Sequence, residues 1–261
     1  MSCTPLYGIT VISLFILVLA VPIYTFFILR LKFTVENAGA IAAAYGSVSA
    51  VTFVTAVSFL EMEQIEFGGH MVAVMALMEA PSIIIGVLLM RLYSNGKKSS
   101  KEFLGLIKHA VTNGSVFLIL GSLVISFIAS DAQAEGIKPF TTDIFKGFLA
   151  VFLLDMGITS GKKIGSLLKK GWFALLFAIV IPIINGVFIA KISGVFLTSE
   201  GDRFLIAILA ASASYIAVPA AMRIAAPKAN PSLYLPMALA ITFPFNITLG
   251  MPLYMYIIQS L

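Results

Sequence analysis

Eight long apolar stretches constrain the fold of this chain more than any motif does. They run over Gly8 to Leu31, Ala38 to Leu60, Met71 to Tyr93, Asn113 to Ala129, Ile144 to Ser160, Trp172 to Phe196, Phe204 to Met222 and Leu233 to Ile258. Each is close to the roughly 20 apolar residues with which an α-helix crosses a bilayer core. Apolar residues make up 60% of the 261 and charged residues only 11%, too few to solvate a globular surface. The sequence therefore predicts an all-α, multi-pass membrane protein in contact with the lipid bilayer along its whole length.

Basic residues predict how the eight spans are oriented, because short cytoplasmic loops retain Lys and Arg. Of the 17 basic residues, 13 fall in alternate loops: Arg30, Lys32, Arg91, Lys97, Lys98, Lys101, Lys108, Lys162, Lys163, Lys169, Lys170, Arg223 and Lys228. The loop with Glu61, Glu63 and Glu66 lies in the other set. We therefore expect both termini to be external. No basic residue precedes the first span, which favours a retained helix over a cleaved signal peptide.

A set of landmarks occurs twice in the same order: a proline, two serines one residue apart, and a second proline. The two copies are Pro22, Ser47, Ser49 and Pro81, then Pro182, Ser212, Ser214 and Pro244. The predicted orientation of the spans carrying the second copy is opposite to that of the first. Inverted repeats of this kind build secondary transporters, with sites where discontinuous helices meet near the bilayer midplane. This pattern predicts that Ser47 lies near Ser212, and that Pro81 and Pro244 break their spans.

The two repeats differ in length. Residues 1–95 would form a partial first repeat of three spans, residues 96–111 a cytoplasmic basic linker, and residues 112–261 a second repeat of five spans. If both repeats are built alike, the first is expected to start two spans before Met1. A truncated gene, a late start, or a split transporter whose two missing helices come from another chain would each account for this difference.

Three segments carry a family resemblance: YGSVSAVTFVTAVSFLE, MEAPS, and AASASYIAVPAAMRIAAPKANPS. From Pro22 to the C-terminus the chain resembles the sodium-dependent bicarbonate transporters first described in cyanobacteria. The resemblance implies a bacterial inner-membrane protein of ten helices in two inverted five-helix repeats, of which this chain matches the last eight. It also implies a homotrimer and sodium-coupled uptake of bicarbonate, with Na⁺ as the coupling ion and no other cofactor. Where the family has aspartate after its second serine run, this chain has Tyr215, so the sodium site departs from the family pattern.

The serine pairs also have a physical meaning of their own. An unwound membrane helix frees backbone groups that only side chains, water or a ligand can satisfy, so it is tolerated where it lines a cavity. Half-helix N-termini attract a small anion, while hydroxyls and carbonyls offer oxygen ligands to sodium. The candidate substrate-binding residues are Gly46, Ser47, Ser49, Ser212 and Ser214, and the candidate ion-binding residues are Thr52, Glu79, Tyr215, Thr242 and Asn246. The alternative is that small and hydroxylated residues simply let helices pack closely.

Two carboxylic acids lie inside predicted spans. Glu79 stands two residues before Pro81, and Asp155 lies within the fifth span. A carboxylate at such a depth is unfavourable by about 2.5–3.5 kcal/mol, so it normally faces a cavity or a partner. We expect Glu79 to face the cation, unless it is protonated and bonded to backbone. Asp155 either faces the pathway or pairs with Lys162 or Lys163.

Other classes of function find no support. His70 and His109 show no metal-binding spacing, Cys3 is the only cysteine, and no hydrolase or nucleotide-binding motif occurs. Basic residues sit in short loops, which argues against a nucleic-acid partner. The linker is too short to favour docking of the PII-like regulator that binds the family's longer loop. The sequence thus predicts a permease and not an enzyme, with a non-transporting remnant or an accessory membrane subunit as the alternative.

Overall fold

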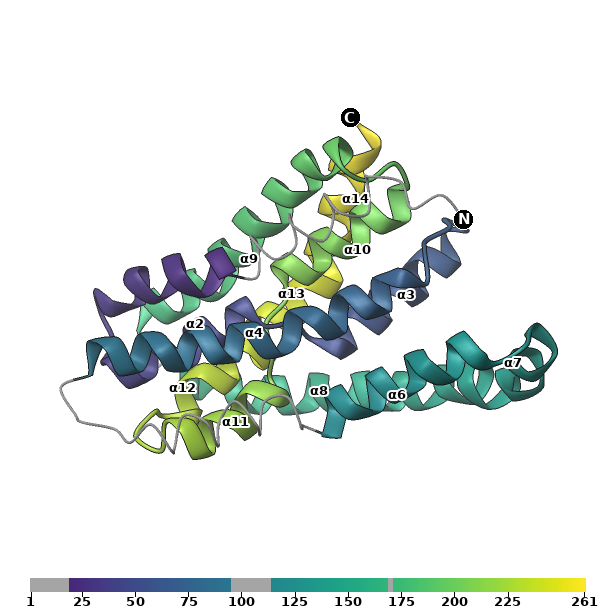
Figure 1. Cartoon of the computed structure of the whole chain (residues 1–261). Helices are drawn as coiled ribbons and strands as arrows, with labels where there is room; N and C mark the ends of the chain where they lie inside the picture. The colour runs from purple at the N-terminus through teal and green to yellow at the C-terminus, as the bar shows by residue number, and fades with distance from the viewer. Residues whose placement is uncertain (1–18, 95–113, 169–170) are drawn as a thin grey trace.

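The computed structural model describes residues 19–94, 114–168 and 171–261, and over these residues it contains helices and turns but no strand (Figure 1). The predicted linker at 96–111, Cys3, His109 and residues 8–18 of the first predicted span lie outside this part of the chain. The described helices begin with Leu19–Arg30, α2 (Val35–Gly46), α3 (Ala50–Met62), α4 (His70–Tyr93), α6 (Gly114–Ile128), α7 (Asp131–Lys138), η1 (Pro139–Ile144) and α8 (Phe145–Leu168). They continue with α9 (Trp172–Ile192), η2 (Ser193–Val195), α10 (Glu200–Ala211), α11 (Ala217–Ala225), α12 (Pro231–Pro236), η3 (Met237–Thr242), α13 (Phe243–Phe245), η4 (Asn246–Gly250) and α14 (Met251–Gln259).

Five helical segments are long and apolar enough to cross a membrane. They are Val35–Met62, His70–Tyr93, Ala132–Lys162, Trp172–Val195 and Pro231–Gln259, and the shorter apolar helix Leu19–Arg30 accompanies them. The fourth and seventh predicted spans do not appear as long helices in the described residues. The fourth is represented by α6, of 15 residues, and the seventh is divided between α10, of 12, and α11, of 9. A broken span gives two short helices, neither of which crosses a bilayer alone.

Spans two and seven are both interrupted at their serine pairs. α2 ends at Gly46 and α3 begins at Ala50, while α10 ends at Ala211 and α11 begins at Ala217. Ser47 and Ser212 follow the two first halves with nearly the same extended backbone, at φ −84°, ψ 172° and φ −81°, ψ 167°. Both breaks therefore begin in the same conformation, at matching landmarks of the sequence.

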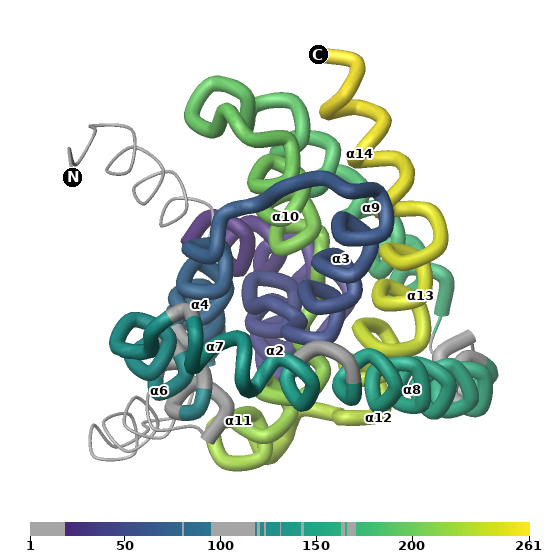
Figure 2. Tube along the Cα trace, turned by 90° about the vertical axis from the view of Figure 1, so that its right-hand side faces the viewer, coloured from purple at the N-terminus to yellow at the C-terminus, as the bar shows by residue number. Residues whose placement is uncertain are grey.

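The halves of the broken spans pack on each other reciprocally. α3 lies against α10, and α11 lies against α2. Each first half also packs on an unbroken helix, α2 on α4 and α10 on α9 (Figures 1 and 2). Between α2 and α4 the approach is close enough that a Cβ built on Gly86 would lie 2.6 Å from the Cβ of Ala43. Small residues thus bring these two helices together as they do in other membrane proteins.

The two prolines do not break their helices, contrary to the prediction from Pro81 and Pro244. α4 continues through Pro81 over 24 residues. The last span stays helical around Pro244, with wide π-helical turns in η3 and η4 on either side of α13. A proline has no backbone N–H, so one carbonyl of the preceding turn loses its hydrogen-bond partner. Inside a membrane protein, a π-helical turn or a nearby side chain can satisfy that carbonyl.

The segment from α6 to α8 lies at the edge of the helical body. Figure 2 shows α6 beside α4 and α8 beside α12, with α7 between them. Ser160 anchors α8 by donating to the carbonyl of Leu239 in η3, at 2.9 Å. Large apolar side chains of α8, including Phe148 and Leu154, remain exposed, as expected of a helix that faces lipid or another protein.

Candidate functional site

The two breaks touch each other through backbone hydrogen bonds. The N–H of Ser49 donates to the hydroxyl of Ser212 at 3.1 Å, and the N–H of Ser214 donates to the carbonyl of Ala44 at 2.8 Å. All four predicted serines are buried. The structure therefore brings the predicted substrate-binding residues together at one place, which we call the crossing and define by residues 46–49 and 212–215.

Each serine hydroxyl at the crossing already has a backbone partner. The hydroxyls of Ser49 and Ser214 accept from the N–H groups of Thr52 and Val218, at 3.2 and 3.3 Å, in the first turns of α3 and α11; Ser49 is also the N-cap of α3. Those of Ser47 and Ser212 donate to the carbonyls of Glu79 and Leu209, at 3.3 and 2.9 Å. The serines thus satisfy backbone groups that a break exposes inside a membrane.

The ends of α2 and α10 are each held by a side chain from the last span of their own half. The hydroxyl of Ser82, in α4, donates to the carbonyl of Gly46 at 2.6 Å. The side-chain amide of Asn246, in η4, donates to the carbonyl of Ala211 at 2.8 Å. Gly46 and Ala211 are the last residues of their helices and directly precede Ser47 and Ser212. Asn246 is one of the candidate ion-binding residues predicted from the sequence. Ser82 is not among the predicted site residues, although its position directly after Pro81 could have indicated it.

Thr52 and Thr242 lie near the crossing but have different surroundings. Thr52 is buried in the first turn of α3, directly after the break. Thr242 donates its hydroxyl proton to the carbonyl of Ala178 at 2.7 Å, so the Tyr45 hydroxyl, also 2.7 Å away, must be the donor to Thr242. These two hydrogen bonds link η3 to α9 and to the end of α2. Thr242 is therefore a helix-packing contact in this conformation.

Glu79 lies beside the crossing in α4, and its side chain is buried. Its backbone carbonyl accepts the Ser47 hydroxyl, which fixes this turn of α4 against the first break. No Lys, Arg or His among the described residues forms an ion pair with its carboxyl group. A buried carboxyl group without an ion-pair partner is either protonated or beside a cation, so both alternatives predicted for Glu79 stay open.

Tyr215 places a buried hydroxyl at the second break. This hydroxyl has no hydrogen-bond partner among the described residues, although it lies close to Ser49. Its ring packs edge-on against Phe243, with centroids 5.4 Å apart. The residue that replaces the family's aspartate thus still offers an oxygen to the crossing.

Asp155 does not belong to the crossing. It is exposed on α8, away from both breaks. Neither a pathway-facing position nor the expected pair with Lys162 is seen, and the side chain of Lys163 lies outside the described part of the chain. No group of three or more His, Cys, Asp and Glu residues in the described ranges is placed to hold a metal ion.

The comparisons with known proteins agree with this geometry. A family model described as the Na⁺-dependent bicarbonate transporter superfamily matches residues 3–259, nearly the whole chain. No curated protein matches it. The broken helices, the crossing and the family match lead to one conclusion: this chain belongs to the Na⁺-dependent bicarbonate transporter superfamily.

Proposed function

We propose that the protein is a secondary transporter that couples the uptake of bicarbonate, or a similar small monovalent anion, to sodium. The observation that carries this proposal is the pair of hydrogen bonds from Ser49 to Ser212 and from Ser214 to Ala44. They join the N-terminal end of each second half-helix to the C-terminal end of the opposite first half-helix. Amide dipoles that attract an anion and carbonyl oxygens that attract a cation thus lie side by side.

The residues divide between the two ions by their chemistry. The anion would bind at Gly46, Ser47, Ser49, Ser212 and Ser214, where α3 and α11 begin. Glu79, Asn246 and the unpartnered Tyr215 hydroxyl would supply oxygens to Na⁺, with Thr52 and Thr242 nearby. Glu79 is the one carboxyl group in this set, so the charge that favours a cation rests mainly on it.

Alternating access would follow from an inverted repeat, in which one group of helices rocks or slides against the other. The matching serine conformations, the reciprocal packing of α3 on α10 and α11 on α2, and the equivalent closures by Ser82 and Asn246 support such a repeat. A trimer in the bacterial inner membrane completes the proposal by family resemblance, and the distribution of basic residues favours external termini.

Uptake of labelled bicarbonate into vesicles, with and without a sodium gradient, tests this proposal. Ser212→Leu should abolish uptake while leaving the protein inserted, because the larger side chain fills the crossing and removes a hydroxyl that solvent cannot replace there. Ser232→Leu, at the exposed start of α12, is the matched control and should transport normally. The proposed site would be ruled out if uptake did not depend on the sodium gradient and was the same in Ser212→Leu as in the parent protein.

A second candidate is a membrane subunit that functions only with another chain. The exposure of Phe148, Leu154 and the carboxyl-bearing Asp155 on α8 favours it, because a lipid-facing carboxylate is unfavourable. A chain supplying two further helices would be such a partner. Uptake that requires co-expression of a second membrane protein would support this candidate, and uptake by the purified chain alone would exclude it.

A further inference from the structure

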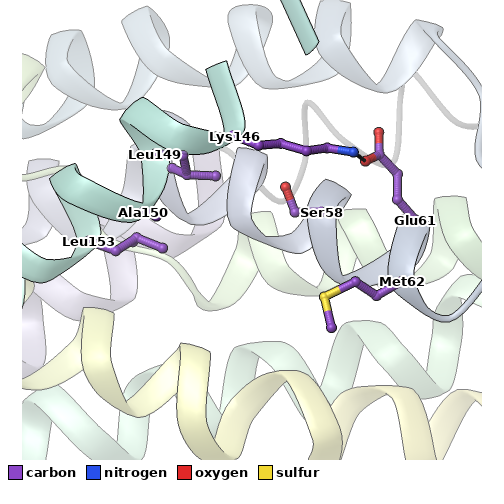
Figure 3. A pocket seen from close by; sticks show the side chains of 7 residues that line it. All are labelled: Ser58, Glu61, Met62, Lys146, Leu149, Ala150 and Leu153. Carbon is purple, nitrogen blue, oxygen red and sulfur yellow. Dashed lines mark ion pairs between the residues drawn. The ribbon is translucent and has the colours of Figure 1, made fainter. Parts of the chain in front are cut away.

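A cavity of about 360 Å³ lies between α3 and α8, apart from the crossing. Figure 3 shows its walls: Ser58, Glu61 and Met62 come from α3, while Lys146, Leu149 and Leu153 come from α8. One water occupies roughly 30 Å³ of liquid. The cavity therefore has room for a small anion together with part of its hydration shell.

An ion pair closes one end of this cavity. The ammonium of Lys146 lies 3.0 Å from the carboxylate of Glu61, and the two side chains are 53% and 42% exposed. α8 packs mainly on α12, η3 and α9, so Lys146 reaches across open space to meet α3 (Figure 3). Ion pairs in contact with water are weak and exchange readily. Glu61 therefore holds Lys146 only weakly.

α3 connects the cavity to the crossing directly. Its first turn is capped by Ser49, and Ser58 lies nine residues further along the same helix, a distance of about 13 Å at the usual rise. Three residues between them are half-buried: Val51, Val54 and Thr55. Their three- and four-residue spacing places them on the same face of α3 as Ser58. This face of α3 therefore runs from the cavity to the first break, with Val51 and Val54 packed against buried apolar side chains.

We propose that the α3–α8 cavity is an anion-binding vestibule, in which Lys146 holds a small planar oxyanion in exchange for the carboxylate of Glu61. Bicarbonate and formate present the same planar O–C–O group that Lys146 contacts in the structure. The Ser58 hydroxyl lies on the same side of the cavity as the ion pair (Figure 3) and supplies a hydrogen bond. This inference rests on the proposed transport function for its role in uptake, while the binding itself is independent of transport.

Thiol labelling in lipid vesicles tests the binding. Cys3 is the only cysteine, so Ser58→Cys in a Cys3→Ser chain gives a single reactive group in the cavity. We expect a negatively charged, sulfonate-bearing methanethiosulfonate to label this cysteine about tenfold faster than a neutral one, because Lys146 attracts the anionic reagent. Lys146→Gln should abolish the difference between the two labelling rates, and Glu61→Gln should increase it. Added bicarbonate or formate should lower the labelling rate of the anionic reagent. Thr198→Cys, exposed in the loop before α10 and on the same predicted side as Glu61, is the control and should respond to none of these changes.

Uptake measurements separate the vestibule from the proposed function. If both hold, Lys146→Gln raises the bicarbonate concentration for half-maximal uptake several-fold and leaves the maximal rate nearly unchanged. Labelling that prefers the anionic reagent through Lys146, in a protein that transports nothing, would sustain the anion site and refute the transport function. A labelling ratio indifferent to Lys146, or unchanged half-saturation in Lys146→Gln, would overturn the vestibule.

Discussion

The hydroxyl of Ser82 lies 2.6 Å from the carbonyl oxygen of Gly46, where α2 stops and the first break begins. Both residues are buried, so water cannot replace this hydrogen bond. Asn246 has the equivalent relationship to Ala211 at the second break. Each broken helix is thus stabilised at its end by a side chain from the last span of its own half.

Removing the Ser82 hydroxyl should destabilise the first break. We expect Ser82→Ala to lower the free energy of unfolding by about 1–3 kcal/mol, because a buried carbonyl loses a partner. Thermal unfolding in detergent measures this change. Ser232→Ala removes an exposed hydroxyl and should leave the unfolding temperature unaltered; equal effects of the two variants would contradict the assignment.

Tyr215→Phe separates function from folding at the second break. The phenylalanine ring keeps the contact with Phe243, while the unpartnered hydroxyl disappears. We expect the free energy of unfolding to stay the same or rise, since an unsatisfied buried group is unfavourable. If that hydroxyl binds an ion, sodium-driven uptake should fall about tenfold, which corresponds to a loss of roughly 1.4 kcal/mol of binding free energy. Uptake at the level of the parent protein would remove Tyr215 from the ion site.

Glu79→Gln should weaken the sodium dependence of uptake more than it harms folding. The amide keeps the shape of the carboxyl group and loses only its charge, and no described cation is left unpaired by the change. The measurement is the sodium concentration for half-maximal uptake, which we expect to rise about tenfold or more. Glu200→Gln, exposed at the start of α10, is the control. An unchanged sodium requirement in Glu79→Gln would place the coupling ion elsewhere.

The close contact of α2 with α4 predicts a difference between glycines. A Cβ at Gly86 would lie 2.6 Å from the Cβ of Ala43 and 2.9 Å from the carbonyl oxygen of Gly39, so Gly86→Ala should destabilise by about 1–3 kcal/mol. In α8, Gly157 has open space around its Cβ position, and Gly157→Ala should be neutral or slightly stabilising. Unfolding temperatures measured side by side test the contrast, which fails if both variants behave alike.

The orientation predicted from the basic residues remains to be measured. In a Cys3→Ser background, Glu63→Cys, between α3 and α4, should react with an impermeant thiol reagent in intact cells. Ser232→Cys, which follows the loop with Lys228, should react only after the membrane is opened. The reverse pattern would invert the whole assignment, including both termini.

The sequence by itself determined the class of protein, its family and the places where helices stop. Apolar length and low charge require membrane helices, the quoted motifs led to the family that the comparison confirms, and serines that cap helices mark both breaks. These signals are local, so a single chain segment contains all the information needed. Pro81 and Pro244 were misleading, because neighbouring elements decide whether a proline ends a helix or only bends it.

Only the tertiary structure decided which residues meet. Ser49 and Ser212 are 163 positions apart, and no periodicity reports a contact at that separation. The same holds for the closing role of Ser82, for the ion pair of Lys146 with Glu61 and for the exposed position of Asp155. In each case the local sequence fixes the residue type and the helix, whereas the packing of distant helices fixes what faces that residue.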